Sequence, residues 1–195
     1  MSTMQQRMLR GELYHADDAT LDAANARAQR LCEAFNATGH DEQQRRDTLL
    51  RELLGELGPG AVIKPTLRCD YGTHIRIGAG TFMNYDCILL DVAPITIGES
   101  CQIAPRVQLL TATHPIDPAV RRAGWESGAP ITLEDNVWLG GGVIVCPGVT
   151  IGRDSVVGAG AVVTRDLPAG VIAVGSPARV LREIDDTDRV PMPTR

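Results

Sequence analysis

The chain has 195 residues, a formal net charge of −5 and a pI near 5.3, and this mild acidity argues against a surface for nucleic acids or other polyanions. No apolar run approaches the roughly 18 to 20 residues that cross a bilayer, and the opening segment MSTMQQRMLRGELY lacks the apolar core of a secretory signal, so we expect a cytoplasmic protein. Five scattered cysteines fit reduced, buried thiols better than a disulfide framework or a paired zinc site.

Residues 1–60 differ in character from the rest and are predicted to form a helical cap. They are rich in Arg, Glu, Gln, Ala and Leu; Asp17-Asp18 and Thr20 supply helix-start chemistry, and Gly39 a helix stop. We expect two or three short helices before Gly58-Pro59-Gly60 ends this part. Two apolar stripes are expected to face the core, namely Leu21, Ala24, Ala28, Leu31 and Phe35, and Leu49, Leu50, Leu53, Leu54 and Leu57.

From residue 61 to 176 an aliphatic residue recurs at every sixth position. A period of six fits neither an amphipathic helix nor a simple alternating strand, and it is typical of the hexapeptide repeat of parallel β-helices. Three hexapeptides make one eighteen-residue turn of a three-sided prism, with the aliphatic residue inside. A sheet sandwich is the alternative, but its strands and turns recur less regularly. The series comprises Ile77, Met83, Leu89, Ile97, Ile103, Leu109, Leu133, Leu139, Val145, Ile151, Val157 and Val163.

Small side chains and glycines are predicted to form the corners of the prism. Small or modest residues stand four positions after the aliphatic ones, at Val137, Val143, Val149, Ser155 and Ala161. Glycines that directly follow aliphatic positions are expected to supply φ freedom for tight bends; they are Gly78, Gly98, Gly140, Gly152 and Gly158.

The period slips near Ala93-Pro94 and fails between His114 and Leu133. A solenoid accommodates an insertion by projecting it outward, so residues 115–130 are predicted to form a projecting loop, and such loops often carry function. An imidazole at the root of the loop suits a general base that takes a proton from a hydroxyl. On periodicity alone, a His114 that only hydrogen-bonds the base of the loop is an equal alternative.

The C-terminal segment, residues 177–195, is predicted to form a short helix followed by a loose tail. The run PARVLREI would form the helix and cover the last coil, and Pro191 and Pro193 lie in the tail.

Three stretches resemble a known family. They are CDYGTHIRIGAGTFMNYDCILLDVAPITIG at residues 69–98, TATHPIDP, and NVWLGGGVIVCPGVTIGRDSVVGAGAVVTRDLPAGVIAVGSPARVL. Together they closely resemble the maltose and galactoside O-acetyltransferase family of hexapeptide-repeat acyltransferases, and MLRGELYHADD resembles its cap domain. The resemblance implies a mainly β protein, a left-handed parallel β-helix with a small helical N-terminal cap and a short C-terminal helix. It further implies a homotrimer with active sites between subunits.

The same resemblance implies the chemistry. Acetyl-CoA would be the co-substrate, a sugar hydroxyl the acceptor, and transfer would be direct, with no metal required. His114 would activate the hydroxyl, and Asn84 would help to stabilise the oxyanion, where a fixed donor contributes roughly 3 to 4 kcal/mol. The positions that match the CoA channel are Gly141, Ala159, Thr164, Arg165, Arg179 and Arg182. For Gly141 and Ala159 turn geometry is an additional explanation, and for the last two arginines a solvated helix end is the alternative.

The polar candidates for the acceptor pocket are Asp17, Asp70, Asn84 and Asp91, while Glu126 is expected to orient His114 or to touch the acceptor. Asp70 stands where the galactoside enzyme has serine, and Val92 where it has the second aspartate of a pair. These differences favour a maltose- or glucose-type acceptor, although another small hydroxyl compound or a glycan precursor stays open.

Two functions outside this class, a metal-dependent lyase and a non-catalytic scaffold, are alternatives. A lyase resembling γ-class carbonic anhydrase needs three histidine ligands, and residues 115–119 after His114 provide none. A non-catalytic trimeric scaffold predicts loss of His114 or Asn84, and both are present.

Overall fold

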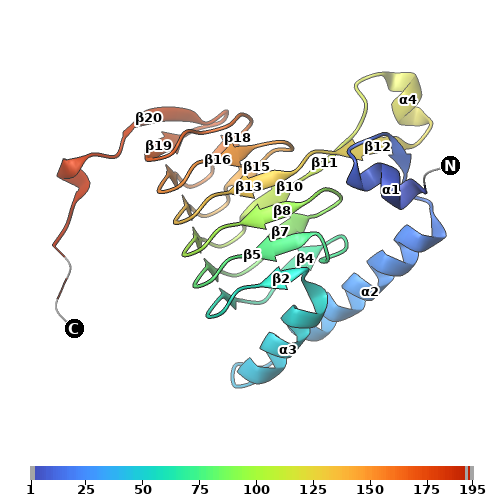
Figure 1. The fold of residues 1–195 in the computed structure, drawn as a ribbon, viewed down its shortest axis with the longest axis horizontal. Coiled ribbons are helices and arrows are strands. Elements are labelled where there is room, and N and C mark those ends of the chain that lie inside the picture. Colours follow the sequence, from blue (N-terminus) through green and yellow to red (C-terminus); the bar gives the residue numbers. More distant parts are fainter. Residues whose placement is uncertain (1–2, 192, 194–195) are drawn as a thin grey trace.

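Short strands stacked in three sheets form most of the molecule, as the computed structural model shows for residues 3–191 and 193 (Figure 1). The chain winds from face 1 to face 2 to face 3 and back to face 1, and strands within each face are parallel. Face 1 contains β2 (Glu56–Leu57), β5 (Ile75–Ile77), β8 (Ile95–Ile97), β13 (Ile131–Leu133) and β16 (Thr150–Ile151). Face 2 contains β3 (Val62–Ile63), β6 (Phe82–Met83), β9 (Gln102–Ile103), β14 (Trp138–Leu139), β17 (Val156–Val157) and β19 (Val171–Val174), with β20 (Arg179–Glu183) added antiparallel at its edge. Face 3 contains β4 (Leu67–Cys69), β7 (Cys87–Leu90), β10 (Gln108–Leu110), β15 (Ile144–Val145) and β18 (Val162–Val163).

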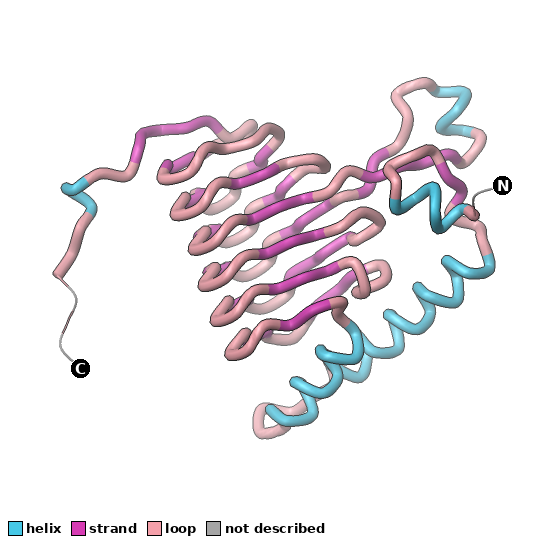
Figure 2. The backbone as a smooth tube through the Cα atoms, in the orientation of Figure 1, coloured by secondary structure: helices cyan, strands magenta, loops and turns pink. Residues whose placement is uncertain are grey.

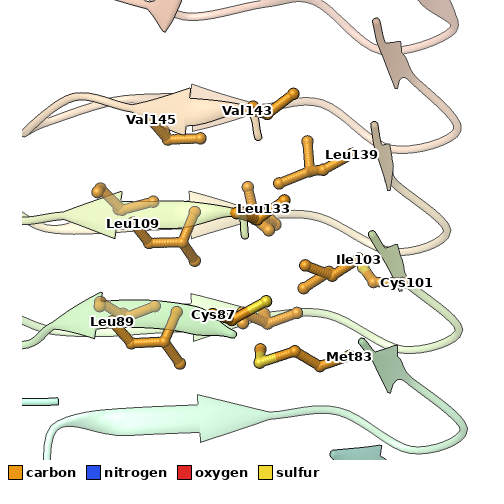
Figure 3. Close-up of a cluster of buried hydrophobic side chains, with 14 of the residues drawn as sticks. Met83, Cys87, Leu89, Cys101, Ile103, Leu109, Leu133, Leu139, Val143 and Val145 are labelled. Atoms are coloured by element: carbon orange, nitrogen blue, oxygen red, sulfur yellow. The ribbon is translucent and has the colours of Figure 1, made fainter. Parts of the chain in front are cut away.

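The interior of this prism is a stack of aliphatic side chains. Figure 3 shows Met83, Ile103 and Leu139 above one another on face 2, and all three are at most 1% exposed. Burial of each methylene group contributes roughly 0.8 kcal/mol. The parallel β-helix predicted from the six-residue period is therefore confirmed.

One corner of the prism carries all of the variation in coil length. The inward residue of a strand on face 1 is always followed six residues later by the inward residue of the next strand, on face 2. A further six residues lead to the inward residue on face 3, as in Leu133, Leu139 and Val145. The separation between the inward residue on face 3 and the next inward residue on face 1 varies. It is eight residues from Cys69 to Ile77 and again from Leu89 to Ile97. It then becomes 24 from Leu109 to Leu133, six from Val145 to Ile151 and four from Val163 to Leu167. The expected eighteen-residue coil therefore holds only for the coil that starts at Leu133. We call the connection from face 3 to face 1 the third corner.

The glycines that follow aliphatic positions have a different role from the expected one. Positive φ angles occur instead at other corner residues, such as Gly142 and Gly160, and also at Asn136. A Cβ atom on Gly140 would lie 2.6 Å from the backbone nitrogen of Ala159 on the next coil. Gly140 is thus required for close approach of adjacent coils, and not for φ freedom.

The N-terminal cap contains α1 (Met4–Leu9), β1 (Tyr14–His15), α2 (Ala19–Asn36) and α3 (Gln43–Leu53). Asp18 caps α2, because its Oδ1 accepts the N–H groups of Thr20 and Leu21 at 3.0 and 3.3 Å. The predicted stripe of α2 is confirmed, since Leu21, Ala28 and Phe35 are at most 1% exposed. The solenoid begins at β2, before the Gly58-Pro59-Gly60 segment that was expected to precede it.

Residues 115–130 project from the third corner beside the cap (Figure 2). They contain α4 (Pro118–Arg122) and β12 (Trp125–Gly128), and β12 pairs antiparallel with both β1 and β11 (Ala112–Thr113). The segment predicted to project thus contains one helix and one strand, and this small sheet ties it to the cap.

The C-terminal helix prediction is wrong. Residues Arg179–Glu183 form β20, antiparallel to β19, and only a short 3-10 helix follows at η1 (Asp186–Asp188). Gly175, with a φ of 97°, helps to turn the chain back along β19, whose free edge offers backbone hydrogen bonds that outweigh helix propensity. In the part of the chain that the structure describes, no helix is both long enough and apolar enough to cross a membrane.

Candidate active site

His114 and Glu126 face each other at the root of the projecting loop. The Nε2 atom of His114 lies 3.9 Å from Oε2 of Glu126, and the two side chains are 59% and 17% exposed. Thr113 and Ser127 are paired on antiparallel strands, and this pairing brings their chain neighbours His114 and Glu126 close together. The structure thus places the predicted base beside a carboxylate.

A cavity of about 230 Å³ lies between α2, the third corner and β12. We call it the corner cavity. Its polar lining consists of Asp22, Asn25, Asp70, Tyr71 and Glu126, and its apolar lining includes Leu21, Leu90 and Val92. Glu126 lines the cavity and also approaches His114, so a molecule bound in the cavity would lie near the imidazole.

The corner cavity is electrostatically negative. Burial raises the pKa of Asp70 to about 6, and the charges of Asp91 and Glu126 add to this shift. Burial also raises the pKa of Tyr14, and the charge of Glu126 raises it further. The Tyr14 hydroxyl is buried and has no hydrogen-bond partner among the described residues.

Asp91 supports the backbone of the cavity. Its side chain is fully buried, and its Oδ1 accepts the N–H groups of Asp70 and Tyr71 at 3.0 and 2.8 Å. Its Oδ2 accepts the N–H of His74 at 3.3 Å. Asp91 does not line the cavity, so the geometry fits a structural role rather than the predicted acceptor contact.

Asp17 lies outside the corner cavity. Its side chain is 88% exposed, with Oδ1 3.7 Å from Nδ1 of His15. It lines a neighbouring cavity of about 330 Å³ together with His15, Ala16 and Arg122. Ala16 lines both cavities, so the two are adjacent.

Asn84 lies at a different corner, between faces 2 and 3. It lines a cavity of about 160 Å³ with the half-exposed Trp138 and with Phe82, Gln102, Ile103 and Ala104. Its Oδ1 accepts the N–H of Tyr85 at 2.8 Å. Gly141 and Ala159 follow β14 and β17 at the same corner, and the Gly141 carbonyl accepts the N–H of Gly160 at 2.9 Å. We call this the second corner.

The remaining predicted CoA residues lie on the last coils. Thr164 and Arg165 follow β18 at the third corner. Arg165 and Arg179 line one cavity of about 140 Å³, beside Asp166. Arg182 lies apart from them and forms a two-pronged ion pair with Asp188, each N···O distance being 2.6 Å.

The predicted base and the predicted oxyanion donor lie at two different corners of the prism. Asn84 precedes β7 and His114 follows β10, at opposite ends of face 3, where these strands are paired. The length of the paired strands therefore lies between the two side chains. The structure does not bring the predicted base and the predicted oxyanion donor together within one chain.

Sequence reasoning missed Asn25, Asp22, Tyr14 and Tyr71. Asn25 stands four residues after Leu21 on the inner side of α2, and its Nδ2 donates to the Asp70 carbonyl at 2.9 Å. The signal that could have identified Asn25 in the sequence was its helical spacing from a residue of the apolar stripe. Within residues 3–191 and 193, no group of three or more His, Cys, Asp or Glu side chains is arranged to hold a metal ion.

Two family models match the chain. The model described as maltose acetyltransferase hexapeptide capping motif matches residues 7–58, and the model described as bacterial transferase hexapeptide (six repeats) matches residues 130–165. Nodulation protein L of Rhizobium meliloti (strain 1021) is 50% identical over 178 residues, which cover 91% of this chain and 97% of that protein.

Solved structures are also similar to this chain over nearly its whole length. A maltose O-acetyltransferase from Clostridium difficile 630 is similar with a TM-score of 0.94 and 45% identity, covering 95% of this chain and 99% of the other. A galactoside acetyltransferase in complex with coenzyme A is similar with a TM-score of 0.93 and 37% identity, covering 96% of this chain and 94% of the other.

Proposed function

Because the chain belongs to the maltose and galactoside O-acetyltransferase family and is an acetyl-CoA-dependent acetyltransferase, we propose that it acetylates a hydroxyl of a maltose- or glucose-type sugar. The observation that carries the proposal is the corner cavity. It is a polar pocket of sugar size, and Glu126 connects it to a partly exposed imidazole.

The proposed reaction is a direct transfer. The His114 imidazole removes the proton of the acceptor hydroxyl as the hydroxyl oxygen attacks the thioester carbonyl carbon of acetyl-CoA. The Asn84 amide donates to the oxyanion that forms, and collapse of the intermediate breaks the C–S bond. The CoA sulfur leaves with the electron pair and takes the proton from His114. No covalent enzyme intermediate is needed, because both substrates are held together.

We propose that the complete site forms between subunits of a homotrimer. Asn84, Gly141 and Ala159 share the second corner, whereas His114, Thr164 and Arg165 share the third corner. If the second corner of one subunit faces the third corner of the next, the two sets of residues meet. The CoA chain would then run between the two corners, with Arg165 and Arg179 near its phosphates.

The acceptor is tested with acetyl-CoA and a panel of maltose, glucose and galactosides, by following the release of free thiol. We expect thiol release to depend on maltose or glucose. Absence of sugar-dependent release across the panel would contradict the proposed acceptor class.

The shared site is tested by mixing two inactive variants, His114→Ala and Asn84→Ala, after unfolding and refolding them together. In a cyclic trimer with sites between neighbours, random mixing restores about a quarter of the wild-type sites. Sites that lie within single subunits would give no recovery. Each variant refolded alone is the control.

A further inference from the structure

Two cysteines meet where the cap packs on the solenoid. Cys32, in the last two turns of α2, has its Sγ atom 3.6 Å from Sγ of Cys69, the last residue of β4. Both residues are buried, and both thiols are free in this structure. A disulfide bond holds its two sulfur atoms about 2.05 Å apart, so an approach of roughly 1.5 Å converts this contact into bonding distance.

Amide side chains of α2 fix the helix against β4, which is the edge strand of face 3. These amides lie on the same side of α2 as Cys32, at steps of three or four residues along the helix. They donate to backbone carbonyls along the strand: Asn25 to Asp70 at 2.9 Å, Gln29 to Cys69 at 2.8 Å and Asn36 to Leu67 at 2.9 Å. Hydrogen bonds on both sides of Cys32 therefore hold the two thiols facing each other.

This pair of thiols stands apart from the other cysteines. In the described part of the chain no other two sulfur atoms are in hydrogen-bond contact. The thiols of Cys87 and Cys101 donate to backbone carbonyls instead, and Cys146 is partly exposed. An oxidised sulfur at Cys32 or Cys69 thus has a second thiol beside it, which favours a disulfide over the higher oxidation states of sulfur.

We propose that Cys32 and Cys69 form a redox-sensitive link, in which hydrogen peroxide oxidises the dithiol to a disulfide that joins the cap to the solenoid. Burial of the pair restricts the reaction to an oxidant as small as a peroxide. With Cys69 as the hydrogen-bond donor, the contact between the thiols lowers the pKa of the Cys32 thiol. Cys32 is therefore the thiol that reacts first.

The reaction proceeds in two balanced steps. The Cys32 thiolate attacks one peroxide oxygen and the O–O bond breaks, which leaves a sulfenic acid on Cys32 and a hydroxide that takes up the thiol proton as water. The Cys69 thiol then attacks the sulfenic sulfur, the S–S bond forms, and the S–O bond breaks. The departing oxygen leaves as a second water with the Cys69 proton. The two thiols lose two electrons and two protons, and the peroxide accepts them.

The link would act on the corner cavity. Asp70 directly follows Cys69, and Asn25 lies two helical turns before Cys32; both line the cavity, and they are hydrogen-bonded to each other. Bonding of the sulfur atoms draws β4 and α2 together, so the cavity between these segments changes shape. We expect the oxidised enzyme to bind the acceptor more weakly. The link itself is independent of the proposed function, whereas its effect on the acceptor rests on that function.

The test treats the reduced wild-type enzyme with hydrogen peroxide, removes the peroxide with catalase and blocks the remaining thiols with N-ethylmaleimide under denaturing conditions. Peptide mapping should find Cys32 joined to Cys69, and dithiothreitol should reverse the link. The melting temperature should rise by about 5 °C or more, since the bond closes a loop of 37 residues. The KM for the accepted sugar should rise about threefold or more, while the KM for acetyl-CoA stays at its reduced value.

Cys32→Ser removes one sulfur atom and should abolish the effects of peroxide on the melting temperature and on the KM for the sugar. Cys32→Ala is a second variant that places no hydroxyl among the apolar neighbours of this position. Cys146→Ser is the matched control: it removes a partly exposed thiol that has no cysteine beside it among the described residues, and it should keep the wild-type response to peroxide.

Either of two results would overturn the inference. Cys32 and Cys69 stay unlinked at peroxide concentrations that oxidise Cys146, or they become linked with no change in the melting temperature and in the KM for the sugar. Both results are read from reduced and oxidised wild type, so neither depends on how well a variant folds. Absence of sugar-dependent thiol release in the reduced enzyme would remove the proposed function, and mapping and melting would still decide whether the link forms.

Discussion

His114 and Glu126 are held 3.9 Å apart by two antiparallel strands, one from the solenoid and one from the projecting loop. Replacement of His114 by alanine should lower kcat by a factor on the order of 10² or more, because the acceptor hydroxyl loses its base. The melting temperature should change little, since the imidazole is largely exposed. Steady-state thiol release and thermal denaturation measure both effects. His40→Ala, at an exposed position of the cap, is the matched control, and wild-type turnover in His114→Ala would contradict the mechanism.

Glu126→Gln should lower kcat by about tenfold, because a neutral amide orients and stabilises a protonated imidazole less well than a carboxylate. A separate measurement of kcat and of KM for each substrate distinguishes this role from a general loss of folding. The KM for acetyl-CoA should stay at the wild-type value. Glu33→Gln, on the exposed side of α2, is the control for loss of one carboxylate. Equal kcat in Glu126→Gln and wild type would exclude a positioning role.

Asp70→Asn should stabilise the protein above pH 6 and not near pH 4. The pKa of Asp70 is about 6 in the folded chain against an ordinary value of 3.8, so between these values the folded state binds more protons than the unfolded state. Stability therefore falls as the pH rises through this window, by roughly 1 to 3 kcal/mol for this group. Urea unfolding of variant and wild type at both pH values measures the difference. A gain of equal size at pH 4 would show that charge is not its cause.

Gly140→Ala should destabilise the solenoid by about 2 kcal/mol or more, because the added Cβ would lie 2.6 Å from the Ala159 nitrogen on the next coil. Gly160→Asn is the matched comparison. Gly160 has a φ of 71° with no atom within 4 Å of an added Cβ, and Asn136 adopts a similar φ of 56°. We expect a cost of about 1 kcal/mol or less at Gly160. Thermal denaturation of both variants shows which of them loses more stability. If φ freedom were the main role of Gly140, the Gly160 variant would lose more.

Arg179→Ala should raise the KM for acetyl-CoA by about tenfold with little change in kcat, since a charge-assisted contact to a phosphate contributes roughly 1.5 to 3 kcal/mol. Arg153→Ala, whose partner is Glu134 at the surface, is the control. Acetyl-3′-dephospho-CoA identifies the phosphate involved: the variant and the wild type should differ less with this donor if Arg179 contacts the 3′-phosphate. An unchanged KM for acetyl-CoA would remove Arg179 from the CoA site.

The sequence was sufficient for the interior of the solenoid because each inward residue, such as Leu139, is placed by a local step of six. It was insufficient where distant segments decide the structure. The segment that begins at Arg179 pairs with the free edge of β19 instead of forming the internal hydrogen bonds of a helix, and no local sequence pattern predicts that edge. The corner cavity likewise depends on Asn25 meeting Asp70, 45 residues away. The break in the period and the family resemblance both pointed to His114, and the inserted loop pointed to Glu126, whereas only the packing of the cap added Tyr14.

The uneven third corner also has a consequence for how this protein can diversify. An insertion of one residue at either of the other corners would send the next strand's aliphatic residues to the outside, because strand side chains alternate. At the third corner, lengths of eight, 24, six and four residues are all followed by correctly placed inward residues, such as Ile97, Leu133, Ile151 and Leu167. Whole third-corner segments can therefore be replaced by others, by natural variation or by grafting. Such a replacement can change acceptor specificity while the buried aliphatic residues of the interior stay the same.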